Sequence, residues 1–173
     1  MAKKEHFIID GYNVINAWPE LISFKDNLEF ARDKLVNIMA EYGAYQHYDI
    51  TIVFDALFTA QNESYEQINK NLAIVFTDEG ETADSYIEKL SYKLVREGIE
   101  VYVVTSDWAE QTVILGAGAY RMSSRELRKA VHKAKKKIEE EYTNHVRLVS
   151  RRELGCRIKY DVAKKMDELR KRK

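Results

Sequence analysis

Four aspartates in this chain stand where apolar, β-branched stretches run out. Asp10, Asp55 and Asp107 each end or directly follow such a stretch, and Asp84 lies at the start of a helical pattern that follows another. In an open parallel α/β sheet, ligands bind at the carboxyl ends of the strands, where the strand order reverses. Since each aspartate belongs to a different strand–helix connection, one fold could gather all four into a single acidic cleft.

Each aspartate also has an ordinary structural explanation. Asp84 comes two residues after Thr82, a candidate N-cap, so it could merely complement the helix dipole. Asp107 could itself be an N-cap with Glu110 three residues on, and Asp55 could be a turn residue. We favour the cluster, because four carboxylates at one edge repel one another unless a cation neutralises them.

The expected cation follows from the ligand type. Carboxylates without cysteine or paired histidine favour a hard, oxygen-binding ion, Mg²⁺ or Mn²⁺. Such an ion lowers the pKa of bound water and stabilises a transferring phosphoryl group, so the predicted reaction is phosphodiester hydrolysis. Asn13 and Ser106 are expected to orient the phosphate or the water. The expected ligands, or holders of metal-bound waters, are Asp10, Asp84 and Asp107, with Asp55 nearby.

Other chemistries lack their motifs. The chain has no G-x-x-x-x-G-K-[ST] and no G-x-G-x-x-G after its first strand, so no nucleotide cofactor is expected. A small-phosphoester phosphatase would want D-x-D after that strand, yet Asp10 is followed by Gly11 and Tyr12. A phosphoacceptor receiver domain would want adjacent acids there and a lysine after the last strand. A lone Cys156 excludes a disulfide framework and a multi-cysteine metal site.

The elements that would position these residues alternate along the chain. Buried strands are predicted at 6–10, 49–56, 72–77 and 99–106, and amphipathic helices at 28–46 and 82–98. This alternation predicts an α/β fold with a mostly parallel sheet.

The remaining segments carry weaker signals. Gly11 is interpreted as a residue that lets the chain turn away from the first strand, and residues 57–71 as a surface loop or short helix. The glycine-rich stretch 116–120 is interpreted as a turn. A capping box, Ser123 to Glu126, predicts a long charged helix over 123–145, with a further helix beginning near Ser150.

Charge is divided unevenly over the 173 residues. Residues 1–120 hold 9 Lys and Arg against 20 Asp and Glu, whereas residues 121–173 hold 19 against 8. This split predicts an acidic functional surface beside a basic surface that docks a polyanion, although a solvated basic helix face with a frayed tail is the alternative. No apolar run approaches the ~20 residues of a membrane span. The N-terminus has no signal-peptide pattern, so a cytoplasmic protein without a membrane partner is expected.

Four motifs, in order, closely resemble the YacP-like branch of the NYN-domain ribonucleases, which are relatives of PIN-domain nucleases. They are "DGYNVINAW" at 10–18, "VFDA" at 53–56, "ETADSYIEKL" at 81–90 and "TSDWAEQ" at 105–111. Together with "GAGAYRMSSRELRKAV" at 116–131, the resemblance covers most of residues 5–145.

The resemblance implies a three-layer α/β/α PIN-like (NYN) fold over residues 1–145. Residues 146–173 carry no motif of the family, and their basic composition predicts a helical C-terminal extension of the same domain. The resemblance implies an acidic Mg²⁺ or Mn²⁺ site at Asp10, Asp84 and Asp107, with Asp55 near it and Asn13 belonging to the "DGYN" motif. It also implies an endoribonuclease that associates with the ribosome, through rRNA, and cuts mRNA in the ribosomal A site during translation.

Such a site needs basic surface nearby, because an acidic cleft by itself repels RNA. Tyr12 and Trp18 are candidates for stacking on bases, and packing against the first helix is the equal alternative for Trp18. A non-catalytic RNA- or ribosome-binding module that keeps a vestigial acidic pocket remains the rival hypothesis. The residues predicted to hold the RNA backbone are Arg121, Arg125, Arg128, Lys129 and Lys133.

Overall fold

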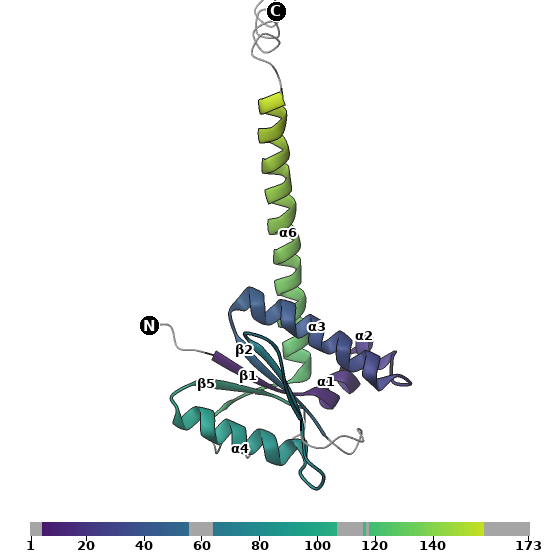
Figure 1. Cartoon of the computed structure of the whole chain (residues 1–173), viewed down its shortest axis with the longest axis vertical. Helices are drawn as coiled ribbons and strands as arrows, with labels where there is room; N and C mark the ends of the chain where they lie inside the picture. Colours follow the sequence, from purple (N-terminus) through teal and green to yellow (C-terminus); the bar gives the residue numbers. More distant parts are fainter. Residues whose placement is uncertain (1–4, 56–63, 107–115, 117, 158–173) are drawn as a thin grey trace, which may run out of the picture. The chain divides into compact units, whose positions relative to one another are not determined.

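Six strands form one sheet in the order β3-β4-β2-β1-β5-β6 (Figure 1). The computed structural model describes residues 5–55, 64–106, 116 and 118–157. The strands are β1 (Glu5–Asp10), β2 (Asp49–Phe54), β3 (Ser64–Asn69), β4 (Leu72–Phe76), β5 (Glu100–Val104) and β6 (Tyr120–Met122).

All neighbouring strands are parallel except β3, which pairs antiparallel with β4. From the central β1 the chain proceeds to β2 and β4 on one side, and then crosses to β5 on the other. The strand order therefore reverses between β1 and β5, and their carboxyl ends form the switch point at which such sheets bind ligands. The predicted α/β fold with a mostly parallel sheet is confirmed.

Alternate residues of the strands enter two separate cores, one on each face of the sheet. In β1, Phe7 and Ile9 join the core beneath helix α3 (Leu28–Gln46), whereas Ile8 joins the core beneath helix α4 (Ala83–Arg96). Figure 1 shows α3 and α4 on opposite faces of the sheet. The result is the predicted α/β/α arrangement of three layers.

Both covering helices have the ends that their sequences indicate. The Thr82 side chain caps α4 by accepting a hydrogen bond from the backbone N–H of Ser85 at 3.2 Å. Gly98, just beyond the end of α4, has a φ of +80°, a conformation that glycine adopts without steric cost. Helix α3 is capped by Asn27, which accepts from the N–H of Phe30.

The segment after β1 differs from the prediction. Gly11 opens helix α1 (Gly11–Ala17) instead of a turn, and α2 (Pro19–Ile22) follows. A Cβ on Gly11 would lie 2.2 Å from a ring carbon of Phe54. Glycine is therefore required here by close packing between α1 and β2, and not by an unusual backbone angle.

Two further predictions about elements are wrong, whereas the predicted glycine turn is confirmed at Gly118, which has a φ of +83° and lies two residues before β6. Residues 64–69 form the edge strand β3 and not a loop or short helix. The helix opened by Ser123 and Glu126 has its capping box, but it continues as α6 (Ser124–Arg157) through Ser150, where a separate helix was predicted to begin. Residues 57–63 lie outside the described residues.

The described residues fall into two compact units that divide between Ala134 and Lys135. The first unit contains the sheet, α1 to α4 and the first turns of α6, where Leu127, Val131 and Ala134 are buried in the same core as α3. The second unit is helical as far as Arg157. Within the described part of the chain, no helix combines the length and apolar character needed to cross a membrane.

Candidate active site

Asp10 stands at the carboxyl end of the central strand and caps the helix that follows. Its Oδ1 accepts a hydrogen bond from the backbone N–H of Asn13 at 3.1 Å. Burial raises the pKa of Asp10 to about 6, and the negative charges of Asp84 and Asp55 contribute, against the lowering effect of the Asn13 N–H. The carboxylate is therefore rigidly held, partly desolvated and close to like charges.

Asp55 and Asp84 reach the same edge from β2 and α4. The Asp55 Oδ2 accepts a hydrogen bond from the backbone N–H of Ala83, the first residue of α4, at 3.4 Å. This bond satisfies one of the free amide groups at the start of a helix and ties α4 to the end of β2. Asp84, the next residue, is exposed in the first turn of α4. The structure thus brings together three of the four predicted carboxylates; Asp107 lies outside the described residues.

The donor chemistry of this edge fits a hard cation. Asp10 and Asp84 form no ion pair with another described residue, so no lysine or arginine in that part of the chain neutralises them. No three Asp, Glu, His or Cys side chains among the described residues are placed to hold a metal ion by themselves. Mg²⁺ usually keeps several waters and is held by only one or two protein carboxylates, so Asp10 and Asp84 suit it without a complete cage.

Asn13 connects the acidic edge to the far side of the switch point. Its Oδ1 accepts from the backbone N–H of Ser106 at 3.1 Å and from the hydroxyl of Ser124 at 2.8 Å. Because a backbone N–H can only donate, the accepting atom must be the amide oxygen, which leaves the Asn13 NH₂ group as a donor. Ser106 follows β5, so this bond fixes the chain immediately before Asp107.

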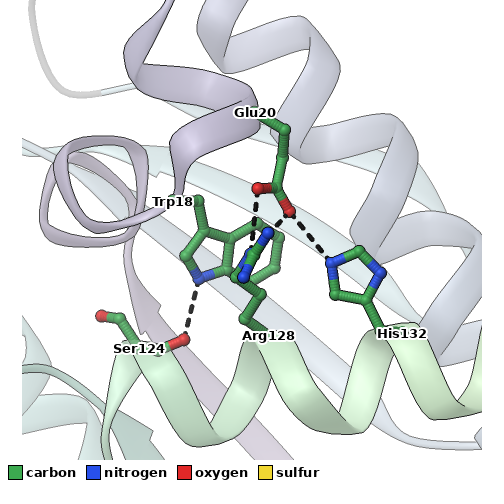
Figure 2. Close-up of polar contacts among 5 residues, drawn as sticks. All are labelled: Trp18, Glu20, Ser124, Arg128 and His132. Atoms are coloured by element: carbon green, nitrogen blue, oxygen red, sulfur yellow. Dashed lines mark hydrogen bonds and ion pairs between the residues drawn. The ribbon is translucent and has the colours of Figure 1, made fainter.

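Ser124 is a site residue that the sequence did not reveal. It is fully buried at the first turn of α6, and its hydroxyl lies 3.2 Å from that of Ser106 as well as bonding to Asn13. Its backbone carbonyl accepts the indole N–H of Trp18 at 2.8 Å (Figure 2). Since Ser124 and Asn13 are 111 positions apart in the chain, only the folded structure could identify this contact.

The two aromatic candidates for base stacking lie in the core. Tyr12 is only 9% exposed, and its ring meets the ring of Phe54 edge-on with 5.2 Å between centroids. Trp18 is 1% exposed, which confirms the packing alternative for that residue. Neither ring offers the open face that stacking requires, so the stacking prediction does not hold.

The residues predicted to bind the RNA backbone differ in how exposed they are. Arg121, Arg125, Lys129 and Lys133 are exposed. Arg128 instead donates from Nε to both carboxylate oxygens of Glu20, at 2.9 and 3.0 Å, and His132 lies 3.3 Å from the same carboxylate (Figure 2). Burial alone would raise the pKa of Glu20, but the hydrogen bond and charge of Arg128 outweigh it and hold the pKa below its usual value. Arg128 therefore joins α2 to α6.

The three layers, the parallel sheet and the carboxylates at its switch point define the class as PIN-like. The family model of the YacP-like NYN domain matches residues 7–171, and the chain belongs to that family. It is 44% identical over 133 residues to YacP of Bacillus subtilis strain 168, with 76% of this chain and 78% of that protein covered.

Solved structures agree with this assignment. The crystal structure of Rae1 (YacP) from Bacillus subtilis matches with a TM-score of 0.73 at 36% identity, over 96% of this chain and 94% of that one. The crystal structure of a point mutant of Rae1 matches with a TM-score of 0.72 at 39% identity, over 82% of each chain. The family is of ribonuclease type, which makes a nuclease role the natural interpretation of the acidic edge.

Proposed function

We propose that this protein is a Mg²⁺- or Mn²⁺-dependent endoribonuclease that cleaves mRNA in the ribosomal A site during translation. The observation that carries the proposal is the convergence of Asp10, Asp55 and Asp84 at the switch point. Neither Asp10 nor Asp84 is neutralised there by a lysine or arginine of the described residues. Membership of the YacP-like NYN family supports the same activity.

Each residue of the acidic edge has a part in the proposed reaction. Asp10 and Asp84, with Asp107, would hold the cation, while Asp55 keeps the start of α4 in place. With a pKa of about 6, Asp10 is ionised at neutral pH and able to bind a cation. The bound cation supplies a water of lowered pKa and stabilises charge on the phosphoryl group. The Asn13 NH₂ group and Ser106 would orient the phosphate or the water.

Substrate binding would depend on the exposed basic residues. Arg121, Arg125, Lys129 and Lys133 offer charge for the phosphates of mRNA and of rRNA at the ribosome. They compensate for an acidic edge that repels RNA.

The test is translation of a reporter mRNA in vitro with the wild type, Asp10→Asn and Asp107→Asn, mapping new 5′ ends with and without ribosomes. We expect cleavage by the wild type that EDTA abolishes and Mg²⁺ restores, and no cleavage by either variant, although both still fold and bind ribosomes. Full activity of Asp107→Asn would refute the site assignment. Ribosome binding by a wild type that never cleaves would instead support the non-catalytic module.

A further inference from the structure

An arginine that the acidic site does not use lies on helix α3. Arg32 donates from Nη1 to the hydroxyl oxygen of Tyr12 at 3.0 Å. Its guanidinium carbon also lies 5.5 Å from the centroid of the Phe76 ring, which is a cation–π distance. The side chain is thus held on one side by a phenol and on another by an aromatic face.

These contacts place Arg32 at the carboxyl edge of the sheet. Tyr12 comes two residues after Asp10, and Phe76 is the last residue of β4. Phe54, the last residue of β2, joins them, since its ring centroid is 5.2 Å from that of Tyr12 and 5.5 Å from that of Phe76. An aromatic wall therefore runs across the ends of β1, β2 and β4, with Arg32 against it on the α3 side of the sheet.

Most hydrogen-bond donors of the Arg32 guanidinium are unused within the described part of the chain. Arginine carries five N–H donors, and among the described residues Arg32 uses only the one to Tyr12 and forms no ion pair. It is partly buried, so it has lost part of its hydration without gaining an anion in return. Arg128, by contrast, is neutralised by Glu20.

We propose that Arg32 forms a phosphodiester-binding subsite beside the acidic edge, where it binds the backbone of single-stranded RNA next to the bond that is cleaved. The inference rests on the proposed function. A planar guanidinium matches two phosphate oxygens in a bidentate manner, and its fixed position reduces the entropy lost on binding. The acidic edge would hold the reacting phosphate through its cation, and Arg32 would hold a neighbouring one directly.

The test measures binding of a fluorescent single-stranded RNA to the full chain by anisotropy, in EDTA and over a series of KCl concentrations. Arg32→Met keeps the length and apolar character of the side chain but removes its charge and donors. We expect it to weaken binding about tenfold, the size of one charge-assisted hydrogen bond. We also expect the slope of log affinity against log salt to fall by about 0.7, the value for one bound phosphate.

Three variants separate recognition from folding. Arg32→Lys keeps the charge but not the planar fork, so the salt slope should stay while affinity falls severalfold. Tyr12→Phe removes the hydroxyl that orients Arg32 and should weaken binding without changing the slope. Arg96→Met is the matched control, because Arg96 is exposed in the last turn of α4, at the opposite edge of the sheet, and it should bind like the wild type.

The proposal would be overturned if Arg32→Met bound RNA with the affinity and salt slope of the wild type. The same conclusion would follow if Arg32→Met lowered only the melting temperature and left the affinity and the salt slope unchanged. If Arg32→Met does not fold, the proposal would be overturned by an Arg32→Lys variant that binds RNA as tightly as the wild type. A wild-type protein that does not bind RNA at all would also overturn it. Cleavage assays on the same preparations keep the two proposals apart. A wild type that binds through Arg32 but never cleaves would refute the nuclease and leave the subsite standing.

Discussion

A partly buried carboxylate next to two others costs free energy in the metal-free protein, and Asp10 is such a group. Its pKa rises from 3.8 to about 6 on folding, so the folded state favours the protonated form. Below pH 3.8 the group is protonated in both states and costs nothing. As the pH rises through 6, the folded protein must carry the buried charge, and stability falls by up to about 3 kcal/mol.

We therefore predict that Asp10→Asn is more stable than the wild type at neutral pH and that its advantage disappears towards about pH 4. Asparagine retains an oxygen that can accept from the N–H of Asn13, so the cap on α1 is preserved. Urea unfolding in EDTA across this pH range measures the difference. Addition of Mg²⁺ at neutral pH should stabilise the wild type and not the variant. If the stability of both proteins depended on pH in the same way, the charge of Asp10 would not destabilise the folded protein.

A second prediction at the scale of one residue concerns Gly11. Gly11→Ala places a Cβ where the Phe54 ring now lies, 2.2 Å from its nearest atom, so the ring must move. That ring also packs against Tyr12 and Phe76, and overpacking of this kind costs about 1–3 kcal/mol. Denaturant unfolding measures the decrease in the free energy of unfolding.

Phe54→Leu supplies the control for this prediction. If the clash with the ring is the cause, adding Gly11→Ala to Phe54→Leu should cost less than adding it to the wild type. Equal costs in the two backgrounds would point to the backbone of α1 instead.

At the scale of elements, local signals were sufficient wherever the cause of a structure is local. Continuous apolar, β-branched stretches marked the buried strands, and the Thr82 cap and the Ser123–Glu126 box marked helix starts, because each signal depends on residues close in sequence. Strand β3 has largely exposed side chains and is formed by its backbone pairing with β4, so its sequence shows no apolar alternation. The short β6 likewise depends on pairing with β5.

The candidate site divides in the same way. The positions of Asp10, Asp55 and Asp84 followed from strand ends and a helix start, which the sequence indicates. Ser124 and Arg32 act through residues 111 and 20 positions away, and nothing in their own neighbourhood distinguishes them from other serines and arginines. Their roles depend on how the elements are packed.

The prediction at the scale of elements concerns Ser124. Ser124→Ala removes the hydroxyl that joins the start of α6 to Asn13 and Ser106. Loss of a buried hydrogen bond costs about 1 kcal/mol of stability. Without this hydroxyl, Asn13 and Ser106 are no longer held by the common contact with Ser124, so the groups that orient the phosphate or the water are less well positioned. We therefore expect the cleavage rate to fall more than about tenfold, with a larger effect on kcat than on KM.

A matched serine separates positioning from stability in this experiment. Ser91 is also fully buried and donates to the carbonyl of Ile87 within α4, away from the switch point. Ser91→Ala should lose similar stability and keep its cleavage rate. Equal rates in the two variants would mean that Ser124 serves only the core.

At the scale of the whole molecule, the division of charge is the property that matters. Acidic residues dominate the part that contains the sheet, and basic residues dominate from Arg121 onward. Counterion release makes the binding of a polyanion by such a basic segment steeply dependent on salt. Only basic residues without a protein partner contribute fully, and the pairing of Glu20 with Arg128 removes one of them.

The exposed residues Arg125, Lys129 and Lys133 on α6 should therefore carry much of the salt dependence. Changing all three to glutamine should weaken binding of single-stranded RNA and reduce the salt slope by about 2, at about 0.7 for each phosphate that is no longer bound. The control changes Lys70, Lys93 and Arg96 to glutamine, which removes the same charge from exposed positions elsewhere on the surface. If both triple variants reduce the slope equally, binding follows net charge alone. A reduction confined to the α6 variant would identify the start of α6 as the surface that holds the RNA backbone.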